Sequence, residues 1–151
     1  MKFKFPLQTV VRHRKIIEDL AQKDFMEAQA NLNVEIQKLE KMQSDLHESH
    51  LRTGDLQKAG GQQGPALIQI HEFKKGQDVR IERQRYKIQE FEKIVEDKRE
   101  ILRQAALEYK IIEKFKEKKF EEYKFNRNIE EQNEADEQSI LRFGRNSEKM
   151  K

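Results

Sequence analysis

Cysteine and tryptophan are absent from this chain of 151 residues, and it contains only 2 prolines and 6 glycines. Without cysteine, the chain forms neither disulfides nor thiolate metal sites. So few turn-forming residues argue against a sheet protein and favour long, uninterrupted helices. No apolar run approaches the ~20 residues that a membrane-spanning helix needs. Residues 1–7 lack the apolar core of a signal peptide, so we expect a cytoplasmic protein.

Charge dominates what is present. Charged residues make up 39% of the chain and hydrophobic residues 35%, and the mean hydropathy is −1.04. A chain this polar is disordered unless its apolar residues follow a regular pattern. The net charge of +3 comes from 31 basic and 28 acidic residues, which is too mixed a balance to indicate nucleic acid by itself.

The apolar residues do follow a regular pattern, because two segments carry one at every seventh position. The first segment contains Phe25, Leu32, Leu39 and Leu46, and the second contains Ile81, Ile88, Val95, Leu102 and Tyr109. A seven-residue repeat places these side chains along one stripe of a long helix, which must pack against another helix. The breaker-rich stretch 59–65 separates the two segments. We therefore predict an all-α fold, an antiparallel two-helix coiled-coil hairpin with these residues as its seam.

The expected organisation is one coiled-coil domain over residues 1–151. Pro6 suits the first turn of a helix over about 6–53, and Gly54 suits a left-handed cap at its end. The turn is expected at about 54–65 and the longer second helix at about 66–143. Residues 144–151 are expected to form a frayed tail.

The register of the hairpin also follows from the pattern, because numbers of facing residues add to a constant in an antiparallel pair. Leu32 opposite Ile88 and Phe25 opposite Val95 both give 120, which places the fold point at Gly60. The second stripe is interrupted by the polar residues Gln84 and Lys98. Polar seam residues cost stability but fix the register of a coiled coil.

The sequence offers few candidates for a metal-binding or catalytic site. His47, His50 and His71 fall near the expected turn, where a surface metal site is the less favoured alternative to solvent-exposed histidines. Carboxylates are numerous, but a two-helix hairpin offers no sheltered concave site for catalysis. The glycines at 60, 61 and 64 lack the lysine of a phosphate-binding loop. We therefore expect no enzyme activity, no cofactor and no bound metal.

The two ends of the chain carry the features of a binding surface. The segment from Lys2 to Lys15 is basic, and it either contacts an acidic partner, nucleic acid or anionic lipid, or is merely solvated. The second helix outruns the first, so its end is left without an intrachain partner. Apolar residues left unpaired in this way usually mark an interface. This end carries the aromatic residues Phe115, Phe120, Tyr123 and Phe125.

Residues at both ends resemble the FliJ family, the coiled-coil component of the bacterial flagellar type III export apparatus. The N-terminal resemblance rests on Phe5, Leu7, Val10, Val11, Arg14, Glu18, Ala21 and Ala28. The C-terminal resemblance rests on 114–119, Tyr123, Asp136, Glu137 and Arg142. Chain length, the absence of cysteine and the central break are similar as well.

The resemblance implies a stalk like that of rotary ATPases, acting in flagellum biogenesis at the cytoplasmic face of the inner membrane. The implied partners are a hexameric export ATPase, a membrane export-gate protein and export chaperones, with no nucleic acid, and the isolated chain is expected to be a monomer. The equivalent stalk of a virulence secretion system, a structural coiled-coil dimer and a nucleic-acid-binding arm remain alternatives. The implied ATPase-facing end consists of Phe5, Leu7, Val11, Arg14, Ile112, Phe115, Phe120 and Tyr123.

Overall fold

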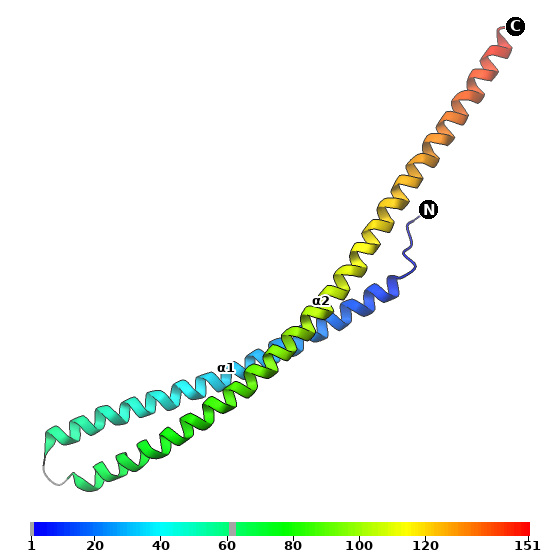
Figure 1. The fold of residues 1–151 in the computed structure, drawn as a ribbon. Coiled ribbons are helices and arrows are strands. Elements are labelled where there is room, and N and C mark those ends of the chain that lie inside the picture. Colours follow the sequence, from blue (N-terminus) through cyan, green and yellow to red (C-terminus); the bar gives the residue numbers. More distant parts are fainter. Residues whose placement is uncertain (1, 61–62) are drawn as a thin grey trace. The chain divides into compact units, whose positions relative to one another are not determined.

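The computed structural model describes residues 2–60 and 63–151, and two helices account for most of them. Helix α1 comprises Gln8–Ala59 (52 residues) and helix α2 comprises Gly64–Lys149 (86 residues) (Figure 1). The described residues contain no strand. The two helices pack against each other, and α2 is the longer. The prediction of an all-α helical hairpin with a longer second helix is confirmed.

The turn is shorter than the sequence suggested. Gly60 has a φ of 64°, the only positive φ among the described residues, and it follows the last residue of α1 as a left-handed cap. Gly54, which we expected in this role, lies inside α1, where a glycine costs only about 1 kcal/mol relative to alanine. Pro65 is the second residue of α2, and the Gln63 carbonyl accepts a hydrogen bond from the Leu67 amide at 3.0 Å.

The outer ends of the helices also differ from the expected bounds. Helix α1 begins at Gln8 and not at Pro6, because the Gln8 amide donates to the Phe5 carbonyl at 3.1 Å in a preceding turn. Helix α2 continues past the expected end at residue 143 to Lys149. Residues 61 and 62, which belong to the expected turn, lie outside the described residues.

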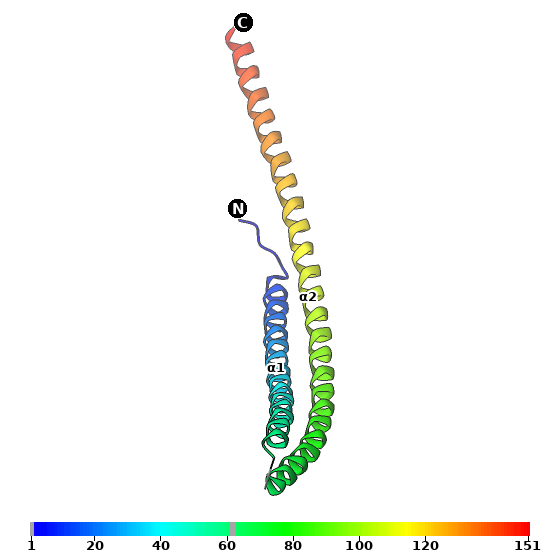
Figure 2. The ribbon, with the colours of Figure 1, turned by 90° about the vertical axis from the view of Figure 1, so that its left-hand side faces the viewer.

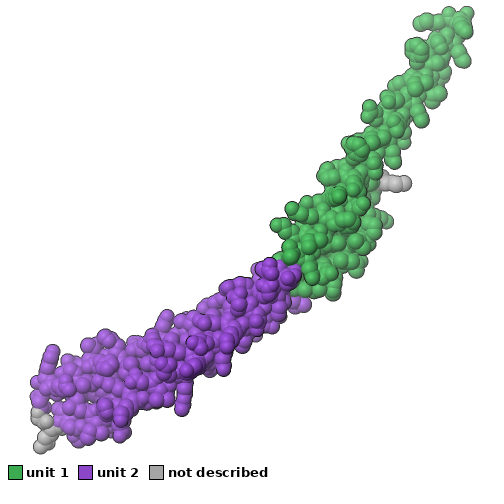
Figure 3. All heavy atoms as spheres, in the orientation of Figure 1, with its two compact units in different colours: residues 1–18, 105–151 green, residues 19–104 purple. Residues whose placement is uncertain are grey.

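The described chain divides into two compact units. Unit 1 combines residues 1–18 with 105–151, and unit 2 comprises residues 19–104 (Figure 3). Each unit thus contains part of α1 and part of α2. Unit 2 includes the turn, and unit 1 includes both termini.

The core of unit 2 is a short stack of apolar layers between the helices. Ala28, Leu32, Ile88 and Val95 are buried, and Phe25, Ile36, Leu39 and Phe91 pack against them. Of the other seam residues, Ile81 is buried, whereas Leu46 and Leu102 are half-buried. Tyr109, the last seam residue, is half-buried in unit 1.

Side-chain hydrogen bonds between the helices report the register within unit 2. The Gln84 amide donates to the Glu35 carbonyl at 2.8 Å, and the Gln77 amide donates to the Met42 carbonyl at 2.9 Å. Both pairs of residue numbers add to 119, within one residue of the sum of 120 that the seam pairs predict. In unit 1, the edge-on contact between the Phe5 and Phe115 rings fits the same register, since their numbers add to 120.

Truncation of a seam residue is expected to destabilise the hairpin. Leu32 is 7% exposed and Ile88 is 8% exposed. We expect Leu32→Ala and Ile88→Ala each to lower the free energy of unfolding by about 2–4 kcal/mol, because each leaves a cavity in a packed layer. Urea denaturation followed by circular dichroism measures this change. Glu92→Ala, at an exposed position, is the control and should have little effect. Equally small effects at all three positions would contradict a packed seam.

Candidate interaction site

The N-terminal segment of unit 1 lies against α2 through aromatic side chains. Lys2 and Lys4 are exposed, whereas Phe3 is half-buried and Phe5 is 8% exposed. This alternation of exposed and covered side chains directs both phenylalanine rings toward the helix. We call the resulting group of rings the aromatic cluster, and it consists of Phe3, Phe5, Phe115, Phe120 and Tyr123.

Ring contacts hold the aromatic cluster together. The Phe3 ring lies 5.2 Å from the Phe120 ring and 5.4 Å from the Tyr123 ring, measured between centroids. The Phe5 and Phe115 rings meet edge-on at 5.8 Å. Tilted and edge-on pairs at these distances are favourable beyond the apolar area that they bury. The Phe3 and Phe5 side chains therefore anchor the segment before α1 on α2.

Basic side chains lie next to these rings. The Lys119 ammonium lies 5.6 Å from the Phe115 ring centroid, and the Lys124 ammonium lies 4.7 Å from that of Phe120. Cations at such distances are attracted to the ring faces. Arg14 forms an ion pair with Glu108, which joins α1 to α2 within unit 1. Lys119 and Lys124 also form ion pairs, each at 3.0 Å, with Glu122 and Glu121. The aromatic cluster thus has a border of paired charges of both signs.

A cavity of about 390 Å³ lies beside the aromatic cluster. Its lining combines ring faces with charged side chains from α2, and it is large enough to receive apolar side chains from a partner. The residues that line it are Phe3, Val11, Tyr109, Glu113, Lys116, Glu117 and Phe120.

Beyond Tyr123, no other described segment of unit 1 covers α2, and every residue from 124 to 149 is exposed. Figure 2 shows α2 continuing past the N-terminal segment. The exposed fraction is 66% at Phe125, 69% at Ile140 and 78% at Phe143. Charge is banded here, because residues 130–137 include five acidic residues and no basic one. We call residues 124–149 the free end of α2.

The residues expected to face the ATPase all lie in unit 1 but differ in exposure. Leu7, Phe115 and Phe120 are each 40% exposed. Arg14, Ile112 and Tyr123 are half-buried, and Phe5 and Val11 are buried. The buried pair therefore supports the surface and does not form it. Sequence reasoning left out Phe3, although its alternation with Lys2 and Lys4 was a usable signal.

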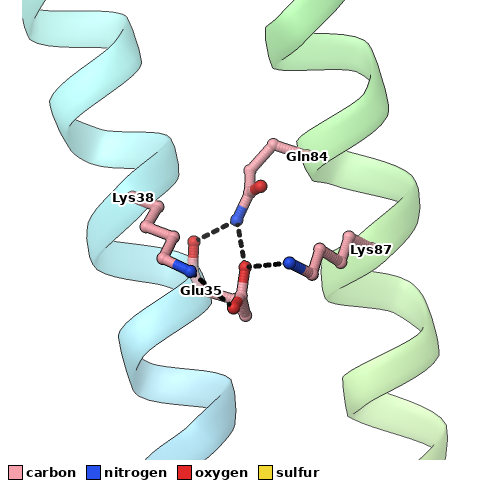
Figure 4. Close-up of polar contacts among 4 residues, drawn as sticks. All are labelled: Glu35, Lys38, Gln84 and Lys87. Carbon is pink, nitrogen blue, oxygen red and sulfur yellow. Dashed lines mark hydrogen bonds and ion pairs between the residues drawn. The ribbon is translucent and has the colours of Figure 1, made fainter.

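A second polar feature lies between the helices of unit 2. Figure 4 shows the carboxylate of Glu35 on α1 between Gln84 and Lys87 of α2 and the neighbouring Lys38. The Gln84 amide lies 2.7 Å from Glu35 Oε2, the Lys38 ammonium 3.1 Å from Oε1, and the Lys87 ammonium 3.5 Å from Oε2. Glu35 is only 5% exposed and Gln84 only 6%. We call these four residues the polar layer.

The polar layer stabilises a charged carboxylate at the seam. The hydrogen bond from Gln84, followed by that from Lys38, holds the pKa of Glu35 below its ordinary value of 4.5, against the opposing effect of burial. Sequence reasoning named Gln84 but missed Glu35. The missed signal was its position in the series Ala28, Glu35 and Met42, whose members are seven residues apart.

Two further properties concern the described residues as a whole. Residues 2–60 and 63–151 contain no group of three or more His, Asp or Glu side chains that could hold a metal ion, including around His47, His50 and His71. Within the same ranges, neither helix has a stretch long and apolar enough to cross a membrane.

Taken together, the packed seam and the exposed, charged end of α2 define an all-helical hairpin protein with an unpartnered end. The chain matches the family model described as "Flagellar FliJ protein" over residues 3–148, and it therefore belongs to the FliJ family. It is a protein related to flagellar export, and members of this family are non-catalytic components of the export apparatus. Comparisons with curated proteins and with solved structures gave no match.

The lowered pKa of Glu35 predicts a pH dependence of stability. A carboxyl whose pKa is lower in the folded state contributes stability that is complete above its ordinary pKa of 4.5 and is lost as the pH falls through the folded value. Glu35→Gln removes this contribution and keeps an acceptor for Gln84. The stability advantage of the parent over Glu35→Gln should therefore shrink on acidification below the ordinary pKa.

Urea denaturation at a series of pH values measures this difference. Glu92→Gln removes an exposed carboxylate from α2 and is the matched control, for which the difference should change little with pH. Parallel pH profiles for the parent and Glu35→Gln would show that the polar layer does not favour the charged form of Glu35.

Proposed function

We propose that this chain is the coupling stalk of the flagellar export apparatus. In this proposal unit 1 binds the hexameric export ATPase, and other parts of the chain contact the membrane export gate and export chaperones at the cytoplasmic face of the inner membrane. The observation that supports it best is the free end of α2, which continues for 26 residues beyond the last half-buried position, Tyr123. Membership of the FliJ family supports the export role in general.

The chemistry of unit 1 suits a protein partner. Large apolar side chains with high exposure act as anchors when a partner's pocket excludes water around them. Phe125, Ile140 and Phe143 have this character. The basic side chains around the aromatic cluster and the acidic band at 130–137 would then set orientation and association rate more than affinity.

The proposed mechanism is conformational and not chemical. A helical hairpin that is bound within a ring of six subunits contacts those subunits unequally. A partner that binds one state of a subunit better than another shifts the equilibrium toward the preferred state. Unequal contacts would therefore couple the position of the stalk to the nucleotide states of the ring, and coupling of this kind is reciprocal.

Self-association is the rival use of the same surface, since exposed apolar residues on the free end of α2 could pair with a second copy. The charge bands oppose it. In a parallel pair in register, the acidic residues at 130–137 face one another, and like charges placed opposite each other are destabilising. Sedimentation equilibrium distinguishes the two, because the proposal expects a monomer.

Serine substitutions at exposed anchors test the ATPase contact. We expect Phe125→Ser with Phe143→Ser to weaken binding to the cognate export ATPase by at least about tenfold, because truncation of an anchor at an interface typically costs more than 1 kcal/mol per residue. Binding is measured by biolayer interferometry. The matched control is Val79→Ser with Tyr86→Ser, which changes exposed apolar residues of unit 2 (51% and 67% exposed).

The activity of the ATPase provides a second measurement. The isolated chain is expected to hydrolyse no ATP, and the full-length chain is expected to raise the turnover of the cognate ATPase or promote assembly of its ring. The Phe125 and Phe143 variant should lose this effect, and the unit 2 variant should retain it. The reverse result, with binding lost only in the unit 2 variant, would place the ATPase contact in unit 2. It would overturn the proposal that unit 1 binds the ATPase.

A further inference from the structure

The apolar seam of unit 2 does not by itself select one register. In the observed register, Leu39 lies opposite Ile81 and Leu32 opposite Ile88. If α2 moved by one heptad along α1 toward the turn, Leu39 would face Ile88 and Leu32 would face Val95. Every one of these pairs is apolar. A strict seven-residue repeat therefore stabilises both registers to a similar extent.

The connection between the helices does not decide between the two registers either. The alternative register moves the fold point from Gly60 by half a heptad, to the neighbourhood of Gly64 and Pro65. Glycine adopts left-handed conformations at no steric cost, and proline suits the first turn of a helix. The breaker-rich sequence is thus compatible with a turn at either place.

The polar residues of the seam do distinguish the two registers. In the observed one, the Gln84 amide reaches both the carbonyl and the carboxylate of Glu35, at 2.8 and 2.7 Å. In the alternative, Gln84 would face Met42, and Glu35 would face Phe91. Glu35 would keep Lys38 of its own helix but would lose both of its partners on α2, Gln84 and Lys87. A carboxylate that is buried against an aromatic ring after losing such partners is destabilising.

A slide in the opposite direction is opposed by the apolar residues themselves. It would place Leu39 opposite Lys74, and it would move the fold point into α1, away from the left-handed residue Gly60. Only one alternative register thus keeps the apolar stripe intact.

We propose that the buried Glu35–Gln84 pair determines the register of unit 2 by destabilising the one-heptad alternative that the apolar seam permits. Lys38 and Lys87 complete the pair, since each places an ammonium group within 3.5 Å of the carboxylate. Gln77 repeats the amide-to-carbonyl contact one heptad away, at Met42, but has no carboxylate opposite it. The discriminating element is therefore Glu35. This proposal is independent of what unit 1 binds.

Exchanging the two residues at positions 84 and 91 tests the proposal directly. The double variant Gln84→Phe, Phe91→Gln keeps the composition of the chain but moves the amide by one heptad. The amide then faces Glu35 only in the alternative register. We expect the exchanged chain to adopt that register, whereas a merely structural role for Gln84 predicts a destabilised chain in the original one.

Because the chain has no cysteine, engineered pairs report the register without background. The pair Leu32→Cys, Ile88→Cys should form a disulfide in the observed register, and the pair Leu39→Cys, Ile88→Cys in the alternative one. In the parent background we expect the first pair to crosslink at least about tenfold faster, since residues displaced by a heptad are about 10 Å apart along the axis. In the exchanged background the preference should reverse.

A removal variant and a second measurement guard against misfolding of the exchanged chain. Glu35→Leu with Gln84→Leu should remain helical and should crosslink through both pairs at comparable rates. Spin labels at the exposed positions of Val34 and Tyr86 should then report two distances instead of one. Glu100→Gln with Arg103→Gln, which removes an exposed ion pair of α2, is the control and should keep the parent register. A single parent-like register in both the exchanged and the removal variant would overturn the proposal.

Discussion

Burial between two helices is the constraint on which this structure depends. The described chain has no third element to cover a helix face, so its apolar side chains can be hidden only where α2 meets α1 or the N-terminal segment. No described side chain is completely buried, and even Val95 is 4% exposed. With so shallow a core, each layer contributes a large share of the stability, and each seam position has a strong influence on the fold.

The same constraint explains why the three buried polar residues of unit 2 are hydrogen-bonded. Glu35, Gln77 and Gln84 are the buried polar residues of the described chain, and each makes a hydrogen bond across or along the seam. Replacing such groups by apolar ones is often neutral for stability. Their presence is therefore better explained by specificity of pairing than by added stability, which is the basis of the register proposal for Glu35 and Gln84.

Much of the fold follows from the sequence because a period of seven requires each helix to pack against another along one stripe. The stripes through Leu32 and Ile88 and the glycine at position 60 predict the hairpin and its fold point from separate observations. Helix ends were less predictable. Gly54 is a residue type that commonly caps a helix, but it does not adopt the left-handed conformation of a cap. The partner of Gln84 was missed for another reason: Glu35 is one of 28 acidic residues, and only its place in the heptad series of Ala28 and Met42 distinguishes it.

The site in unit 1 was predictable in location but not in detail. Counting residues shows that α2 outruns its partner, yet only the structure separates Phe5, which is buried under Phe115, from Phe125, which is exposed. The difference matters for recognition, because a buried ring stabilises the hairpin whereas an exposed one can be buried by a partner. The aromatic cluster thus anchors the start of the chain at the point where α2 begins to extend alone. An export ATPase that binds the free end of α2, as proposed, would meet exposed apolar side chains that no other part of the described chain covers.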